Sequence, residues 1–307
     1  MSFVNDVKDE LTRIEPTCSH CDRALLAAIA RVEGTLKFSG PGSYRLEIST
    51  DTAQVARLAT RLIHQYYHLR TEIVTRQSVL NKTPNYLITV PHQSGLIEAL
   101  KDIGILGTRG LNFGIAPYLV EKNCCAAAYI RGAFLGSGFI SDPRGNFHFE
   151  ITLENNQLAQ DIAALMNKHN MNARILKRRS SSLVYMKSGA SISSFLAFSG
   201  AHRAACAMED ERVRKSLRND TNRKVNAEVA NQEKAAYAAV NQIIDIKKIV
   251  ESGAIHRLTP GLQEFVRLRL DNPEATLKEL GALAHPPLSK SAVYHRVRRL
   301  EEIAKKL

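Results

Sequence analysis

The stretches LAAIARVEG at Leu26–Gly34 and IRGAFLGSG at Ile130–Gly138 share a pattern that indicates how this 307-residue chain folds. Each reads as a short apolar helix, rich in alanine or glycine, that ends at a glycine. The second stretch follows the first after about a hundred residues, and similar elements come after both. The chain therefore contains an internal repeat, and a repeat indicates the architecture more strongly than any single motif.

The residues that follow each glycine match in order, element type and strand face. Alternating apolar residues at 44–48 and 147–151 predict strands, and amphipathic patterns at 52–67 and 156–169 predict helices. Two more strands and a closing helix follow in each copy, at 71–77, 85–90 and 94–103 in the first and at 173–179, 182–187 and 191–198 in the second. Each copy thus reads helix–strand–strand–helix–strand–strand–helix.

This repeat predicts a pseudo-twofold α+β domain over residues 1–205, with repeats at about 20–105 and 122–200. Small residues on the two opening helices would let the helices approach closely at the dyad. They are Ala27, Ala28 and Ala30 in the first copy and Gly132, Ala133 and Gly136 in the second.

The two opening stretches resemble the motif of LAGLIDADG homing endonucleases. The first matches in length, in its apolar opening and in its Glu33-Gly34 ending, and the second in its glycines and apolar residues. In that family the penultimate residue of each motif is a carboxylate, and the two acids hold divalent metal for phosphodiester hydrolysis. Here the pair is Glu33 and Ser137, and Asp142 lies beyond the second glycine in an expected turn. We expect that the nuclease site is lost, with Glu33 pairing with Arg31 or capping a neighbour.

The charge balance favours a polyanionic partner, nucleic acid first. The chain has 42 Lys and Arg against 30 Asp and Glu, a net charge of +12. The excess divides equally, because residues 1–199 hold 22 basic and 16 acidic side chains and residues 200–307 hold 20 and 14. The strands of the second copy carry basic residues that would be secondary DNA contacts, namely Arg174, Lys177, Arg178, Arg179 and Lys187. The matching part of the first copy offers Glu72, Thr75, Arg76 and Val90. This surface could equally hold a partner protein.

Five cysteines are too few for a disulfide scaffold in a chain of this length. Cys18 and Cys21 have a zinc-like spacing, but a structural zinc site needs four ligands and no second pair is evident. Cys124 and Cys125 open the second motif helix and read as core. We therefore expect no metal and no cofactor. No apolar run is long enough for a membrane span, so we expect a cytoplasmic protein.

Residues 206–257 predict a helical linker, with a break and a new cap at 219–222. Residues 258–307 predict three short helices. Thr259-Pro260 opens the first, Thr276 with Glu279 forms a capping box for the second, and Ser289 caps the third. Apolar residues at helical spacing on the third helix predict its buried face: Val293, Val297, Leu300 and Ala304.

The last helix contains no acid between Leu288 and Leu300, which favours a helix-turn-helix unit over a plain three-helix bundle with a solvated basic face. In such units the third helix enters the major groove. We expect DNA contacts from Thr276, Ser289, Lys290, Ser291, Tyr294, His295, Arg296, Arg298 and Arg299. Of these, Lys290 and Arg298 suit phosphate or guanine edges, and Tyr294 suits a sugar or a thymine methyl group.

The combination of a degenerate LAGLIDADG repeat and a helix-turn-helix unit resembles the WhiA family of bacterial proteins over essentially the whole chain. The stretches that carry the resemblance are the two motifs, TNRKVNAEVAN at 221–231, and PPLSKS at 286–291 leading into His295-Arg296. The resemblance implies a nucleoid-associated protein that binds double-stranded DNA without cutting it, and that acts in transcription, cell division, chromosome segregation or sporulation. A scaffold for RNA polymerase or another regulator, and a residual metal-dependent endonuclease, remain as alternatives.

Overall fold

The computed structural model describes residues 2–40, 42–77, 84–108 and 110–307. The chain divides into two compact units, Met1–Lys215 and Ser216–Leu307. Among the described residues, no helix combines the length and the apolar character that crossing a bilayer requires.

The first unit contains the two predicted repeats, in the predicted order of elements. The first copy comprises α2 (Cys21–Val32), β1 (Gly34–Gly40), β2 (Ser43–Thr50), α3 (Ala53–Tyr67), β3 (Glu72–Gln77), β4 (Pro84–Val90) and α4 (Leu96–Asp102). The second comprises α5 (Asn123–Ser137), β7 (Gly138–Ile140), β8 (Phe149–Leu153), α6 (Asn156–Lys168), β9 (Arg174–Lys177), β10 (Ser182–Met186) and α7 (Gly189–Ser199). Helix α1 (Phe3–Thr12) precedes them, and β5 (Leu106–Gly107), β6 (Gly110–Leu111) and the 3-10 helix η1 (Pro117–Leu119) connect them.

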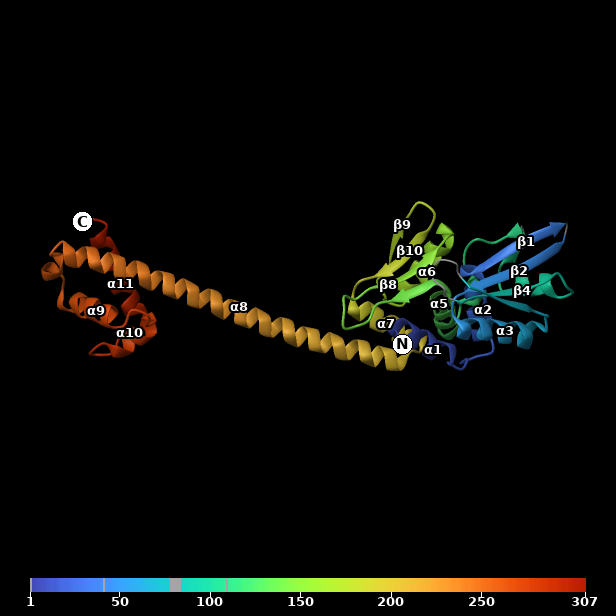
Figure 1. The fold of residues 1–307 in the computed structure, drawn as a ribbon, viewed down its shortest axis with the longest axis horizontal. Coiled ribbons are helices and arrows are strands. Elements are labelled where there is room, and N and C mark those ends of the chain that lie inside the picture. The colour runs from blue at the N-terminus through green and yellow to red at the C-terminus, as the bar shows by residue number, and fades with distance from the viewer. Residues whose placement is uncertain (1, 41, 78–83, 109) are drawn as a thin grey trace. The chain divides into compact units, whose positions relative to one another are not determined.

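Each copy forms a four-stranded antiparallel sheet with the same order, β1-β2-β4-β3 in one and β7-β8-β10-β9 in the other. Figure 1 shows the two sheets side by side, with α2 and α5 between them. Alternate residues of the central strands are buried, among them Ile48, Ile88, Ile151 and Val184. One face of each sheet therefore lies on the core, and the opposite face remains open.

The helices α2 and α5 pack closely because α5 has glycines at the contact. A Cβ atom built on Gly132 would lie 2.5 Å from the carbonyl oxygen of Leu25 and 2.8 Å from Cβ of Ala28. A Cβ atom on Gly136 would lie 2.8 Å from Cγ1 of Val32. The prediction that small residues bring these helices together is confirmed, and the contact joins the two repeats at their pseudo-dyad.

Helix α8 runs without interruption from His202 to Glu251, so the predicted break at 219–222 is wrong. The polar residues find partners compatible with a helix. Thr221 Oγ1 donates to the carbonyl of Leu217 at 2.9 Å, and Asp220 lies 3.7 Å from Arg223 one turn later. Such local contacts let the helix continue through residues that often cap helices.

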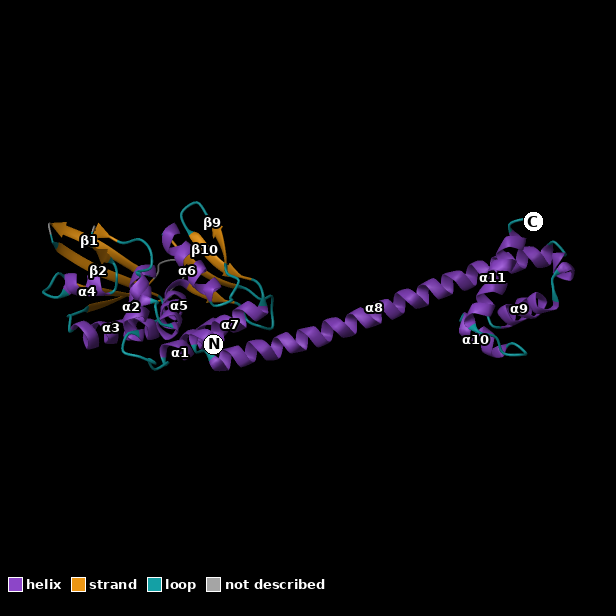
Figure 2. Cartoon of the chain, turned by 180° about the vertical axis from the view of Figure 1, so that it is seen from behind, coloured by secondary structure: helices purple, strands orange, loops and turns teal. Residues whose placement is uncertain are grey.

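In the second unit the end of α8 packs with η2 (Ala254–Arg257) and three short helices, α9 (Pro260–Asp271), α10 (Leu277–Leu283) and α11 (Lys290–Ala304) (Figure 2). Phe265, Leu280 and Val293 are fully buried in its core. The capping box of Thr276 with Glu279 and the cap of Ser289 are both present as predicted. These caps fix the residues at which α10 and α11 begin, so the turn between the two helices ends at Ser289.

Candidate nucleic-acid interface

Helix α11 has one buried face and one exposed face, as the sequence predicts. The hydroxyl of Ser289 accepts the N–H of Ala292 at 3.2 Å and begins the helix. The buried face comprises Val293, Val297, Leu300 and Ala304. With this face in the core, the side chains between these positions must point outward.

The exposed side of α11 carries most of the predicted contact residues. They are Lys290, Ser291, Tyr294, His295, Arg298 and Arg299, preceded by the exposed cap Ser289. Half of the Tyr294 surface is accessible, and its ring centroid lies 6.3 Å from that of His295. Arg299 also contacts Glu302 at 3.2 Å, an exposed pair that costs little to open. The face therefore presents cations, hydroxyls and an aromatic ring in the first turns of one helix.

Arg296 is predicted as a contact residue, but the structure places it against α9. Its Nη1 atom donates to the carbonyl of Gly261 at 2.9 Å and to Glu264 at 3.2 Å. Glu264 also accepts the backbone N–H of His285 at 2.9 Å. Arg296 thus belongs to the contacts between α9 and α11, which spacing along one helix does not reveal.

Thr276 lies at the exposed start of α10, and its cap uses most of its polar groups. Its Oγ1 atom accepts the N–H of Glu279 at 3.3 Å, and its own N–H donates to the Glu279 carboxylate at 2.7 Å. Hydrogen bonds from the backbone and the side chain of Thr276 to this carboxylate lower the pKa of Glu279. The cap therefore already uses the polar groups that Thr276 would offer to DNA.

The strand pairing decides which side chains lie on the open face of the second sheet. Arg174 pairs with Tyr185, which pairs with Glu150, whereas Lys177 pairs with Ser182 on the core side at the end of the strand. All five predicted secondary contacts are exposed: Arg174, Lys177, Arg178, Arg179 and Lys187. Arg174 shares the open face with the central strands, and Lys187 lies beside Tyr185 of that face, with its Nζ atom 5.9 Å from the ring centroid. The others lie at the end of the strand and in the adjoining hairpin.

The open face of the first sheet carries basic residues that sequence reasoning missed. Lys37 and Arg45 pair across β1 and β2, on the same face as Arg76 of β3. Lys37 is bonded to Glu47 at 2.8 Å, whereas Arg45 is exposed and makes no ion pair within the described residues. The alternation of residues in β1 after Gly34 would have identified Lys37. With Lys37 and Arg45 included, the open faces of the two sheets differ less in basic residues than the sequence predicts.

A cavity of about 440 Å³ lies where the motif helices end, and Glu33 and Ser137 both line it. Burial raises the pKa of Glu33 to about 7, a rise that Asp51 and Glu154 increase and Lys8 opposes. Lys8 of α1 lines the same cavity, and burial lowers its pKa. The cavity therefore contains an ammonium group beside the one motif carboxylate.

The remaining groups near the motif ends have other partners. Ser137 Oγ donates to the carbonyl of Thr152 at 2.5 Å. Arg31 donates to the carbonyls of Gly104 and Asn112, so the expected pairing of Arg31 with Glu33 is wrong. Asp142 lies in the predicted turn, where Arg144 lowers its pKa to about 2. Within the described residues, no three acids converge at this cavity as metal ligands would.

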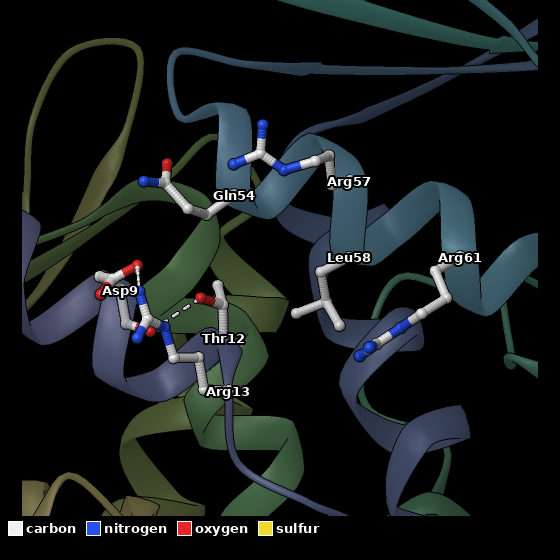
Figure 3. Close-up of a pocket in the computed structure, with 7 residues that line it drawn as sticks. All are labelled: Asp9, Thr12, Arg13, Gln54, Arg57, Leu58 and Arg61. Atoms are coloured by element: carbon white, nitrogen blue, oxygen red, sulfur yellow. Dashed lines mark hydrogen bonds and ion pairs between the residues drawn. The ribbon is translucent and has the colours of Figure 1, made fainter.

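A second basic surface lies between α1 and α3, where a cavity of about 320 Å³ is lined by Arg13, Arg57 and Arg61 (Figure 3). Arg13 is bound to Asp9 at 2.8 Å. Arg57 and Arg61 are exposed one turn apart on α3. Because α3 covers the core side of the first sheet, these two arginines provide a comparison for those on its open face.

The interpretation that Cys18 and Cys21 have no second pair is wrong. Cys124 and Cys125 lie beside them, and the four Sγ atoms lie within 4.8 Å of one another. The two pairs are far apart in the sequence and meet because α2 and α5 begin at the same end of their contact.

Three family models match the sequence in order. They are described as the WhiA N-terminal LAGLIDADG-like domain at residues 19–106, the WhiA LAGLIDADG-like domain at 126–218, and the WhiA C-terminal HTH domain at 221–304. Crystal structures with a similar fold include full-length WhiA of Thermotoga maritima, with a TM-score of 0.61 and 23% identity over 100% of this chain and 99% of that one. The N-terminal LAGLIDADG domain of a WhiA protein matches with a TM-score of 0.53 and 21% identity over 65% of this chain and 90% of that one.

Relatives with higher identity span almost the entire chain. A protein of Alkaliphilus metalliredigens named probable cell division protein WhiA is 38% identical over 99% of this chain and 98% of its own length. A protein of the same name from Thermoanaerobacter pseudethanolicus is 40% identical over 100% of this chain and 98% of its own. With both repeats and the helix-turn-helix domain matched, the chain belongs to the WhiA family.

Proposed function

We propose that this chain is a DNA-binding regulator of cell division that inserts α11 into the major groove and does not cleave DNA. The observation that carries the proposal is the exposed, acid-free first part of α11 opposite a fully buried apolar face. A helix in this position of a helix-turn-helix unit reaches base edges with its early residues.

The exposed side chains suggest distinct roles. Lys290 and Arg298 suit phosphate or guanine O6 and N7, whereas Ser291 and His295 can hydrogen-bond to several bases. Tyr294 offers an apolar ring to a sugar or a thymine methyl group. Arg299, on the adjoining side of the helix, suits the phosphate backbone.

The absence of cleavage is proposed from the residues at the motif ends. Metal-assisted hydrolysis of a phosphodiester needs hard anionic ligands on the cation. Ser137 provides a neutral hydroxyl that already donates to Thr152, and Lys8 provides a positive charge next to Glu33. We therefore assign no enzymatic activity to this cavity.

The test measures DNA binding by the full chain with Lys290, Ser291 and Arg298 replaced by alanine. Sites come from genome-wide crosslinking, which also shows whether they lie at promoters or along the nucleoid more widely. Each good base contact contributes about 1–3 kcal/mol, so affinity for a crosslinked site should fall at least about tenfold. Lys305→Ala with Lys306→Ala, directly after the C-terminal end of α11, is the matched control. Unchanged affinity of the triple variant in gel-shift titrations would overturn the proposal.

A second candidate function is a scaffold for RNA polymerase or another regulator. Exposed apolar side chains on the sheets favour this function, because such side chains pack against a protein partner better than against a phosphate backbone. They are Phe38, Val74 and Leu176. Crosslinking of the full chain in cells, followed by mass spectrometry of the attached peptides, separates the functions. Partner peptides attached to the sheets would support the scaffold, and DNA alone would not.

A further inference from the structure

Four of the five cysteines converge at one point of the first unit. Cys18 lies in the turn before α2, and Cys21 is the first residue of that helix. Cys124 and Cys125 lie in the first turn of α5. All four thiols are free, and two of them are buried.

The distances between the sulfur atoms suit a single small cation. Cys18 Sγ lies 3.4 Å from Cys21 Sγ and 3.6 Å from the Sγ atoms of both Cys124 and Cys125. Four thiolates at about 2.3 Å from a tetrahedral zinc ion lie about 3.8 Å from one another. A disulfide would instead bring two sulfurs to about 2.0 Å, and an iron–sulfur cluster of several metal atoms would hold its ligands farther apart.

We propose that Cys18, Cys21, Cys124 and Cys125 bind one Zn²⁺ ion that joins the amino-terminal ends of α2 and α5. A closed set of four cysteines is typical of a structural zinc site, and a Cys-x-x-Cys turn is its usual half. The second half is a pair of adjacent cysteines on another helix, which explains why spacing in the sequence does not reveal it.

The surroundings compensate the negative charge that such a site carries. Zinc with four thiolates has a net charge of −2, and the N-terminal ends of two helices point their N–H groups toward it. Arg131 of α5 is buried, interacts with the charges of Cys21 and Asp22, and has an Nε atom without a hydrogen-bond partner among the described residues. These positive groups would offset the negative charge of thiolates in a partly buried position.

The zinc ion would connect the two repeats at their shared end. The helices α2 and α5 pack through Gly132 near their middle and meet at Gly136 and Glu33 at the other end. At the cysteine end, the ion would add a link between segments more than a hundred residues apart in the chain. Binding energy at such a site is also folding energy.

The experiment uses the untagged full chain, produced in zinc-supplemented medium and purified in metal-free buffer. We expect stoichiometric zinc by plasma mass spectrometry, and X-ray absorption should show four sulfur neighbours at about 2.3 Å. In the intact protein an alkylating reagent should label Cys206, which is exposed and outside the cluster. All five cysteines should react once the chelator EDTA has removed the zinc.

Two variants test where the ion binds. Cys206→Ser should retain the zinc, whereas Cys18→Ser with Cys21→Ser should lose it. If the double variant does not fold, the alkylation pattern of the wild-type protein still decides the matter. Wild-type protein that contains no zinc after reconstitution would overturn the proposal, as would a Cys18–Cys21 disulfide, bound iron with sulfide, or zinc retained by the double variant.

Discussion

Glu264 of α9 holds Arg296 of α11, with Nη1 of the arginine 3.2 Å from Oε2 of the glutamate. The same carboxylate accepts the N–H of His285 in the turn before α11. Glu264 thus connects the turn to the helix that we propose enters DNA.

The first prediction concerns Glu264→Gln. Hydrogen bonds from His285 and Arg296 lower the pKa of Glu264, so its contribution to stability is present above the ordinary glutamate pKa and lost as pH falls through the lower folded value. The variant should unfold at a lower temperature than wild type at pH 7. The difference should shrink as pH falls below the ordinary glutamate pKa and disappear below the lowered folded pKa, where the carboxylate is protonated in both states. Glu302→Gln, which removes a pair within α11, should change the melting temperature little.

The second prediction separates two neighbouring arginines. Arg298→Ala should weaken DNA binding and leave the melting temperature unchanged, because Arg298 is exposed. If Arg298 contacts a phosphate, the slope of log affinity against log salt should decrease by about 0.9. Arg296→Ala should instead lower the melting temperature, because its partners belong to α9. Equal effects of the two changes on both measurements would contradict these roles.

The third prediction concerns the buried carboxylate at the motif end. Burial raises the pKa of Glu33 to about 7, so the contribution of this group to folding stability is fully present below the ordinary glutamate pKa and is lost as pH rises through the folded value. Glu33→Gln should therefore stabilise the protein at pH 8, on the order of 1–3 kcal/mol, and have little effect at pH 4. Denaturant titrations at the two pH values measure this. The exposed Glu15→Gln is the control, and a loss of stability at pH 8 would argue that Lys8 outweighs burial.

The fourth prediction concerns nuclease activity at the same cavity. Supercoiled plasmid incubated with the protein and Mg²⁺ or Mn²⁺ should remain intact, because Ser137 cannot serve as an anionic metal ligand. Glu33→Gln should leave this result unchanged. Cleavage by wild type that disappears in Glu33→Gln would demonstrate a residual nuclease.

The fifth prediction tests the packing of α2 on α5. A methyl group at Gly132 would collide with the backbone of Leu25, so Gly132→Ala should destabilise the protein by about 1–3 kcal/mol. Gly145→Ala places its methyl group 3.5 Å from the nearest atom, an ordinary contact, and should be almost neutral. Equal stability of the two variants would mean that the helices separate easily.

The open sheet faces require a separate measurement. Arg45→Ala with Arg174→Ala should weaken DNA binding if the strands contact the duplex, since both side chains lie on open faces. Arg57→Ala with Arg61→Ala removes the same charge from α3. A selective loss in the first variant would place DNA on the sheets, and equal losses would indicate only the effect of net charge.

The local patterns of the sequence predict most of this fold. Alternation in the strands and spacing in the helices determine the order of both repeats, and the capping residues Thr276 and Ser289 determine where the last two helices begin. These signals are local because each depends on residues a few positions apart.

The features that the sequence does not reveal depend on distant contacts. Arg296 has the same periodic pattern as its exposed neighbours, and only Glu264 on another helix distinguishes it. Cys18 meets Cys125 only after both repeats have folded. At residues 219–222 the local signal was present but insufficient, because a long helix tolerates capping residues that find partners within it.

Lys8 also limits what a single substitution in this cavity can achieve. It comes from α1, which precedes both repeats, and its ammonium group lies with Glu33 where the motif helices end. An acid introduced at position 137 would therefore share the cavity with the Lys8 ammonium group, which would compete with a metal ion for it. We therefore expect that an acid at position 137 does not by itself create a metal site, and that Lys8 has to be replaced as well.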